Sequence, residues 1–106
     1  MAFVRSSAVV ASTNSSSPTT LQAAVSGEAV IIGLVVANVS SSTDNITVLI
    51  NNGSDNFHLI KSAPVPVGST LSVLDGKVVL GSGDSVKVYA GTSATALEAT
   101  ISVLTL

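Results

Sequence analysis

Short segments in which apolar and polar residues alternate make up most of the chain, and clusters of Gly, Ser, Asn and Asp separate them. In "ITVLIN", Ile46, Val48 and Ile50 fall on one face of an extended backbone, and in "SVKVYAG" Val86 and Val88 do the same. A period of two is the pattern of a half-buried β-strand, because successive strand side chains point to opposite faces. The chain is therefore predicted to form about eight short strands at roughly 8–12-residue spacing, without a helix.

One segment departs from this alternation. "AVIIGLVVANV", from Ala29 to Val39, is apolar at both parities, which predicts a strand buried on both of its faces. A helix is disfavoured here because Val and Ile are stiff, β-branched residues and because Gly33 costs a helix about 1 kcal/mol.

Turn-forming residues mark the ends of the predicted strands. The Asn-Gly pair at Asn52 favours the positive φ of a hairpin turn, and "PVPVGS" must lie at a sheet edge or corner because proline cannot donate to a ladder. The remaining predicted turns or loops are Thr13–Pro18, Ser26–Glu28, Ser40–Asn45, Asp75–Gly76 and Gly81–Asp84.

The fold class that follows is all-β. A chain of 106 residues with this pattern predicts one β-sandwich domain over residues 1–106, of jelly-roll or Greek-key, immunoglobulin-like type. Residues 1–25 alternate only loosely, and the two alternatives for them are an N-terminal arm and an edge strand.

The composition excludes several classes of function. Only 9% of residues are charged, the net charge is -2, and the four cations are scattered, so no patch could neutralise a run of nucleic-acid phosphates. The longest apolar stretch is about half of a membrane span, and the apolar run near the N-terminus is too short for a signal peptide. We therefore expect no nucleic-acid partner, no membrane partner and no export signal. A surface this poor in charge favours a subunit of an assembly.

Candidate chemistry is sparse. His58 is the single imidazole and no serine lies in a G-x-S-x-G turn, so we expect no enzyme activity and no catalytic residue. There is no cysteine, and the acids lie mostly in turns, where they can bond their own backbone. We expect no cofactor and no metal centre, although two loops at one sandwich end that bring acids together around calcium remain an alternative.

The best candidates for a functional role are exposed apolar and aromatic residues. Tyr89 faces out of its strand on a charge-poor surface, which suits an interface anchor. The C-terminal segment presents Leu104 and Leu106 opposite to its core-facing residues, and such a strand needs to be covered by the fold or by a neighbour. With Phe3 and Val4 of the N-terminal segment, these residues form the predicted interface.

Two long stretches carry a resemblance to a known group of proteins. "IIGLVVANVSSSTDNITVLI", followed by "VPVGSTLSVLDGKVVLGSGDSVKVYAGTSATALEATISVL", resembles small β-sandwich virion structural proteins of tailed bacteriophages, of the capsid decoration or cement kind. The resemblance covers roughly residues 31–104 and contains no catalytic residue.

The resemblance implies a virion component that works by binding. Its most favoured role is a decoration or cement protein on the outside of the shell, which it stabilises. Its partners are then the major capsid protein or other virion proteins, together with further copies of this chain, and its location is the virion. The alternatives are a tail, neck or fibre component, then a carbohydrate-binding or adhesion module. An enzyme ranks last.

Overall fold

The computed structural model describes residues 2–74 and 76–106, and within these the chain forms nine β-strands and no helix. It follows that no helix in the described part of the chain could cross a membrane. The strands are β1 (Ala2–Val9), β2 (Thr19–Gln22), β3 (Ala29–Asn38), β4 (Asp44–Asn51), β5 (Asn56–Val65), β6 (Thr70–Ser72), β7 (Val78–Leu80), β8 (Ser85–Ala90) and β9 (Leu97–Thr105).

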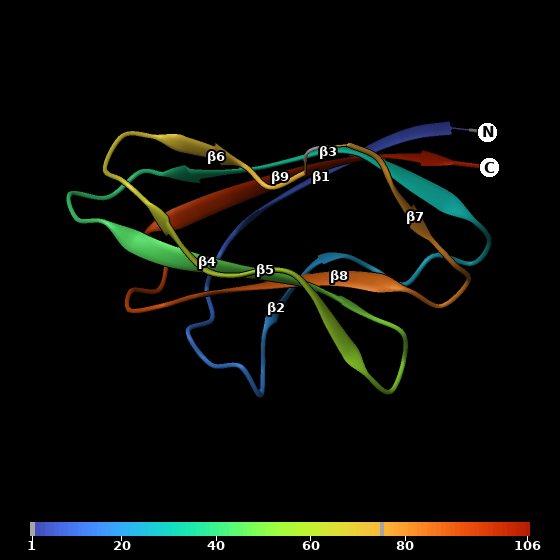
Figure 1. The fold of residues 1–106 in the computed structure, drawn as a ribbon, viewed down its shortest axis with the longest axis horizontal. Coiled ribbons are helices and arrows are strands. Elements are labelled where there is room, and N and C mark those ends of the chain that lie inside the picture. The colour runs from blue at the N-terminus through green and yellow to red at the C-terminus, as the bar shows by residue number, and fades with distance from the viewer. Residues whose placement is uncertain (1, 75) are drawn as a thin grey trace.

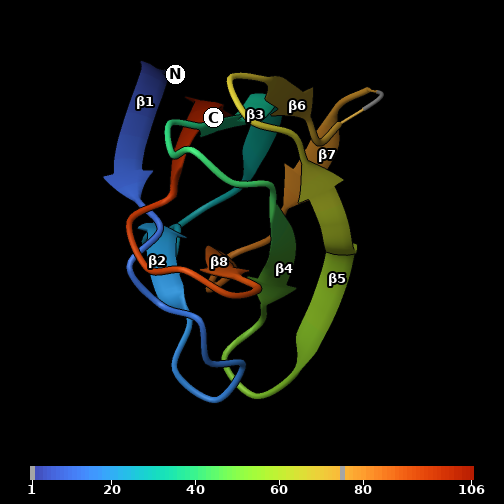
Figure 2. The same cartoon turned by 90° about the vertical axis from the view of Figure 1, so that its left-hand side faces the viewer.

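The strands form two antiparallel sheets that face each other, which confirms the predicted all-β sandwich (Figure 1). The first sheet has the order β1-β9-β3-β6, and β7 also pairs with β3. We call it sheet A. The second, sheet B, has the order β2-β8-β4-β5. Figure 2 shows the two layers end-on, with the chain passing repeatedly from one to the other.

The core lies between the sheets and consists of small aliphatic side chains. Its largest fully buried members come from both layers, as the inward side of each alternating strand requires. They include Ile31, Leu34, Ile46, Leu80, Leu97 and Ile101. As predicted, Val86, Val88 and Ala90 of β8 point into this core.

The prediction that Ala29–Val39 is buried on both faces is wrong. Ile32 and Val35 are 40% and 39% exposed, because β3 has one face on the core and one face outside. The register on β9 shifts between Ile31 and Gly33, so Ile32 is the extra residue of a β-bulge. The bulge moves the core-facing positions from the odd to the even residue numbers, which explains why the sequence is apolar at both parities.

Most of the predicted turns fall between the strands, but the predicted loop Ser40–Asn45 overlaps the start of β4, which begins at Asp44. Gly53 has φ of 104°, and Asn52 accepts hydrogen bonds from the backbone N–H groups of Ser54 and Asp55, so the hairpin between β4 and β5 has the expected chemistry. The predicted turn at Asp75–Gly76 includes Asp75, which lies outside the described residues. Pro64 lies within β5, a sheet-edge strand, as expected of a residue that cannot donate to a ladder.

The C-terminal strand is not a bare edge. β9 pairs with β1 on one side and with β3 on the other, so both of its edges are satisfied inside sheet A. β1 takes the edge position instead. The N- and C-termini lie next to each other at one end of the sandwich (Figure 1).

Candidate interaction surface

The outer face of sheet A carries a row of apolar side chains at the end where the two termini lie. In antiparallel sheets, directly opposed residues share a face and their Cβ atoms lie about 5 Å apart. The register opposes Phe3 to Leu104, Leu104 to Val30, and Val30 to Val79. These four residues, one from each of four adjacent strands, are called the apolar row below.

The apolar row is open to solvent at both of its ends. Phe3 is 78% exposed and Val79 is 66% exposed, while Leu104 and Val30 between them are half-buried by their neighbours. Ile32, the bulged residue of β3, adds an exposed side chain nearby. Isolated exposed apolar residues are ordinary, but a contiguous row across four strands is typical of an interaction site.

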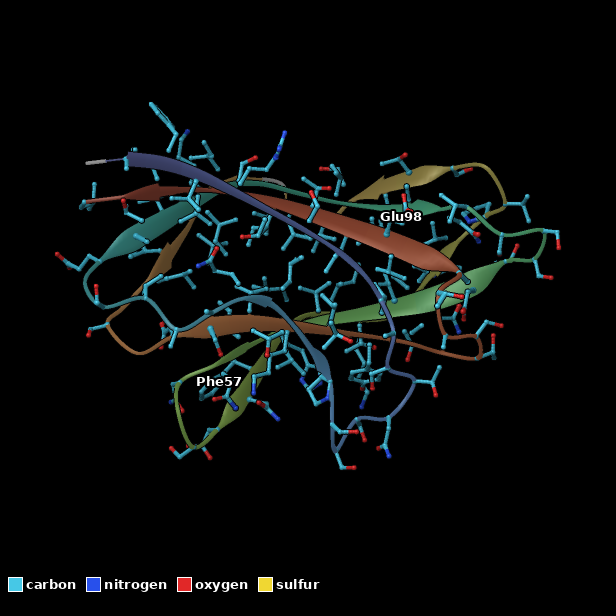
Figure 3. All side chains as sticks on the ribbon, turned by 180° about the vertical axis from the view of Figure 1, so that it is seen from behind. Phe57 and Glu98 are labelled. Carbon is cyan, nitrogen blue, oxygen red and sulfur yellow. The ribbon has the colours of Figure 1, made fainter. Side chains whose placement is uncertain are left out.

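The same face carries more polar side chains toward the other end of the sandwich. Ser7 opposes Thr100, and their hydroxyl oxygens lie 3.0 Å apart in a hydrogen bond. One step further along, Val9 opposes Glu98, which projects from β9 (Figure 3). Val9 and Val35, the latter opposite Thr100, are exposed there as well, so this end of the face mixes apolar and polar side chains. Arg5, two residues from Phe3, places a charge beside the apolar row.

The structure brings together some of the predicted interface residues and separates others. Phe3 and Leu104 are direct cross-strand partners, and Leu106, 63% exposed, follows at the same end of the sheet. Val4 is opposite Val103, so it lies on the inner side of β1 and is 38% exposed only because β1 is an edge strand. Tyr89 lies in β8, on the outer face of sheet B, so it belongs to a different surface.

Sequence reasoning missed Val30 and Val79. A signal for Val30 is present in the sequence, because Ala29–Val39 is apolar at both odd and even positions. A strand with only one face on the core cannot bury both sets of residues. Burial on both faces is one interpretation of this pattern. An exposed apolar face fits the same pattern.

Asp44 fixes the end of sheet B to the loop between β8 and β9. Its carboxylate accepts hydrogen bonds from the Thr92 backbone N–H at 2.9 Å, the Thr92 hydroxyl at 3.0 Å and the Ser93 N–H at 3.0 Å, as well as from Asn45. Burial alone would raise the pKa of Asp44, but these hydrogen bonds to the charged form outweigh it and lower the pKa. The arrangement is structural, because Asp44 is only 3% exposed.

The described residues offer no metal site of the usual kind, because no three His, Cys, Asp or Glu side chains among them are grouped where they could hold an ion. Asn38, buried in β3, has its amide fully occupied: it donates to the carbonyls of Ser42 and Val65 and accepts from Ser40. The side chains of Asp44 and Asn38 thus hold neighbouring loops in place through hydrogen bonds to their backbone.

Comparisons with known proteins identify the fold and no more. No protein-family model matches the chain. No curated protein sequence matches it either. Among solved structures, a pentameric capsid protein from metagenomic phage sequences is 14% identical over 96% of this chain and 59% of its own, with a TM-score of 0.51.

Two further similar structures have other roles. A hydroxypropylphosphonic acid epoxidase from S. wedmorenis is 13% identical over 97% of this chain and 43% of its own, with a TM-score of 0.47. An Eiger TNF from S. frugiperda is 13% identical over 98% of this chain and 85% of its own, with a TM-score of 0.48. The chain thus spans less than two thirds of the epoxidase and of the capsid protein. At these identities the likeness concerns the β-sandwich alone.

Proposed function

We propose that this chain is a non-enzymatic structural protein of a tailed-phage virion, which binds the outside of the shell and stabilises it. The observation that carries the proposal is the apolar row, exposed on the outer face of sheet A in a domain with very few charges. The centres of protein interfaces are depleted in charge and rich in aromatic and aliphatic anchors. Phe3 at the edge of the row is the natural anchor.

The fold supports the same proposal. We infer a jelly roll, because the sheet orders β1-β9-β3-β6 and β2-β8-β4-β5 interleave strands from the whole chain, and the connections cross between the layers. A phage capsid protein is among the structures with a similar sandwich. Together with the resemblance of residues 31–104, this favours a virion over an adhesion module or an enzyme.

The mechanism we propose is stabilisation by mass action. A subunit that binds the assembled shell, and not its separated parts, shifts the equilibrium toward the shell by an amount that grows with its concentration. The occupant of the apolar row is then a weakly charged, apolar patch of the major capsid protein. A carboxylate or ammonium group opposite the row would be buried without a partner and would oppose binding.

Self-association is part of the proposal and would use the free edge of β1. β1 is an eight-residue edge strand that pairs with β9 in continuous register and contains no proline. Exposed, regular edge strands are templates for pairing with another chain. By contrast, β5 at the edge of sheet B has two register shifts, Pro64, and Ser62 with φ of 52°, all of which discourage pairing.

The copy number of the chain in purified virions, measured by quantitative mass spectrometry against the major capsid protein, tests this function. A simple ratio to the shell subunit supports decoration of the shell. A few copies per particle would move the chain to the tail, neck or fibres. Absence from particles would overturn the virion proposal in all its forms.

A further inference from the structure

The outer face of sheet B contains a depression that has no part in the function proposed above. Its volume is about 540 Å³, within the range of sites that hold small ligands. It lies between the loop that follows β1 and the outer sides of β4, β5 and β8. The lining residues are Thr13, Ser15, Leu49, Asn56, His58, Lys61 and Tyr89.

The irregularity of β5 accounts for the shape of this face. The register between β4 and β5 shifts twice, at Ile46–Val48 and at Val48–Leu49, and bulges of this kind bend a strand and redirect its side chains. Ser62 adopts a positive φ of 52° there, and its backbone N–H donates to the Thr47 hydroxyl at 3.0 Å. The bend turns Lys61 toward the depression, beside His58.

A buried leucine lies beneath the depression. Leu49 lies opposite Lys87 and His58 in the register, which places it on the outer face of sheet B, yet it is only 1% exposed. It is separate from the main hydrophobic core between the sheets. Tyr89, half-buried on the neighbouring strand, supplies an aromatic ring to the same depression.

The rim of the depression is polar and carries positive charge. Thr13, Ser15 and Asn56 offer hydroxyl and amide groups, and all three are exposed. Lys61 supplies a cation, His58 supplies an imidazole ring, and the lining includes no acid, although the protein as a whole has a net charge of -2. The acid nearest in sequence to a lining residue is Asp55, which precedes Asn56 in the turn between β4 and β5.

We propose that this depression binds an acidic sugar, a pyranose ring that carries a carboxylate, such as a uronic acid unit of a polysaccharide. The half-buried Tyr89 ring suits the C–H face of a sugar, and the rim hydroxyls and amide suit its hydroxyl groups. Lys61 suits the carboxylate, since hydrogen bonds between ionised partners are the stronger ones. A neutral sugar would leave Lys61 without a partner.

The experiment titrates the isotopically labelled full chain with trigalacturonic acid and follows amide shifts by NMR. Its methyl-esterified form serves as the matched uncharged ligand, and hexaglutamate as an acidic peptide of another class. We expect shifts confined to residues that line the depression, with the free acid binding more tightly than the ester. Lys61→Gln should weaken binding of the acid by about fivefold to tenfold, since it removes one charged hydrogen-bond donor.

Lys77→Gln is the matched control, because it removes the same charge from the β6–β7 connection of sheet A, and it should leave binding unchanged. Tyr89→Ala should weaken binding of acid and ester alike. Lys61 is exposed, so its variant is expected to fold, and the wild-type titration is decisive in any case. The proposal is overturned by absent shifts, by equal binding of ester and acid, or by hexaglutamate binding as well as the sugar.

Discussion

The two outer faces of this sandwich differ although both belong to sheets built from the same Val, Ser and Thr-rich sequence. On sheet A the residues that point away from the core include the exposed apolar row of Phe3, Leu104, Val30 and Val79. On sheet B the outward apolar residue Leu49 is fully buried below a polar, cationic rim. Whether an outward side chain is exposed or buried thus depends on whether neighbouring strands and loops cover it.

Under the two proposals above, the two faces bind different kinds of partner. An apolar row on a regular sheet suits a large, flat protein partner, whose binding depends on the area removed from water. A bent strand with a hollow suits a small polar ligand, whose binding depends on a few placed groups. A subunit with sheet A against a shell would leave the depression of sheet B facing outward.

The largest predicted effect concerns the apolar row. Phe3→Asp should weaken binding to shells assembled without this chain by about a hundredfold, because it removes an aromatic anchor and places a charge in an apolar contact. Phe57→Asp is the matched control: Phe57 is 59% exposed, on β5 of sheet B (Figure 3), and its loss should not affect shell binding. Co-sedimentation with shells measures both. Equal losses in the two variants would show that shell binding does not depend specifically on the apolar row.

The second prediction compares the two faces by stability. Leu49→Ala should lower the free energy of unfolding by about 2 kcal/mol, the cost of truncating a buried leucine. Val30→Ala, on the more open face of sheet A, should cost less than about 1 kcal/mol. Urea denaturation followed by circular dichroism gives both values. Equal destabilisation of the two variants would contradict the burial of Leu49 on the outer face of sheet B.

The third prediction concerns Asp44, which ties sheet B to the loop that leads into β9. Asp44→Asn should cost about 1–2 kcal/mol of stability, because the amide cannot accept every hydrogen bond that the carboxylate accepts. Asp55→Asn, in an exposed turn, is the control and should change stability little. The same denaturation measurement applies.

The pH dependence follows from the lowered pKa of Asp44. The unfolded chain takes up the proton more readily than the folded one, so the stabilisation is complete above the unfolded pKa of about 3.8. It is lost progressively as the pH falls from there through the lower folded pKa. The wild-type protein should lose stability as the pH falls through this range, and Asp44→Asn should reduce the dependence of its stability on pH. An unchanged dependence in the variant would contradict the assignment to Asp44.

The smallest predicted effect is that of salt. Raising the salt concentration from about 50 mM to 500 mM should weaken the binding of trigalacturonic acid a few-fold, because Lys61 is exposed and its interactions are screened. Shell binding through the apolar row should stay constant or strengthen. Shell binding that weakens with salt, together with sugar binding that does not, would contradict both assignments.

The sequence alone determined the class of fold and most of its boundaries. Period-two alternation placed Ile46, Val48, Val86 and Val88 in the core, and Asn52 marked its hairpin, because these features depend on neighbouring residues only. Phe3 and Leu104 were both predicted for the interface, without any indication that they are opposed. That pairing joins residues at the two ends of the chain, and local pattern carries no information on it.

Only the tertiary structure decided which faces are exposed. The bulge at Ile32 exchanged the inward and outward positions within a single strand, and a shift of one residue reverses every side chain beyond it. The placement of Tyr89 away from Phe3 depended on which sheet each strand joined. The depression around Leu49 arose from the bend in β5 and the loop after β1. Each of these follows from the pairing of distant segments, which period and composition do not encode.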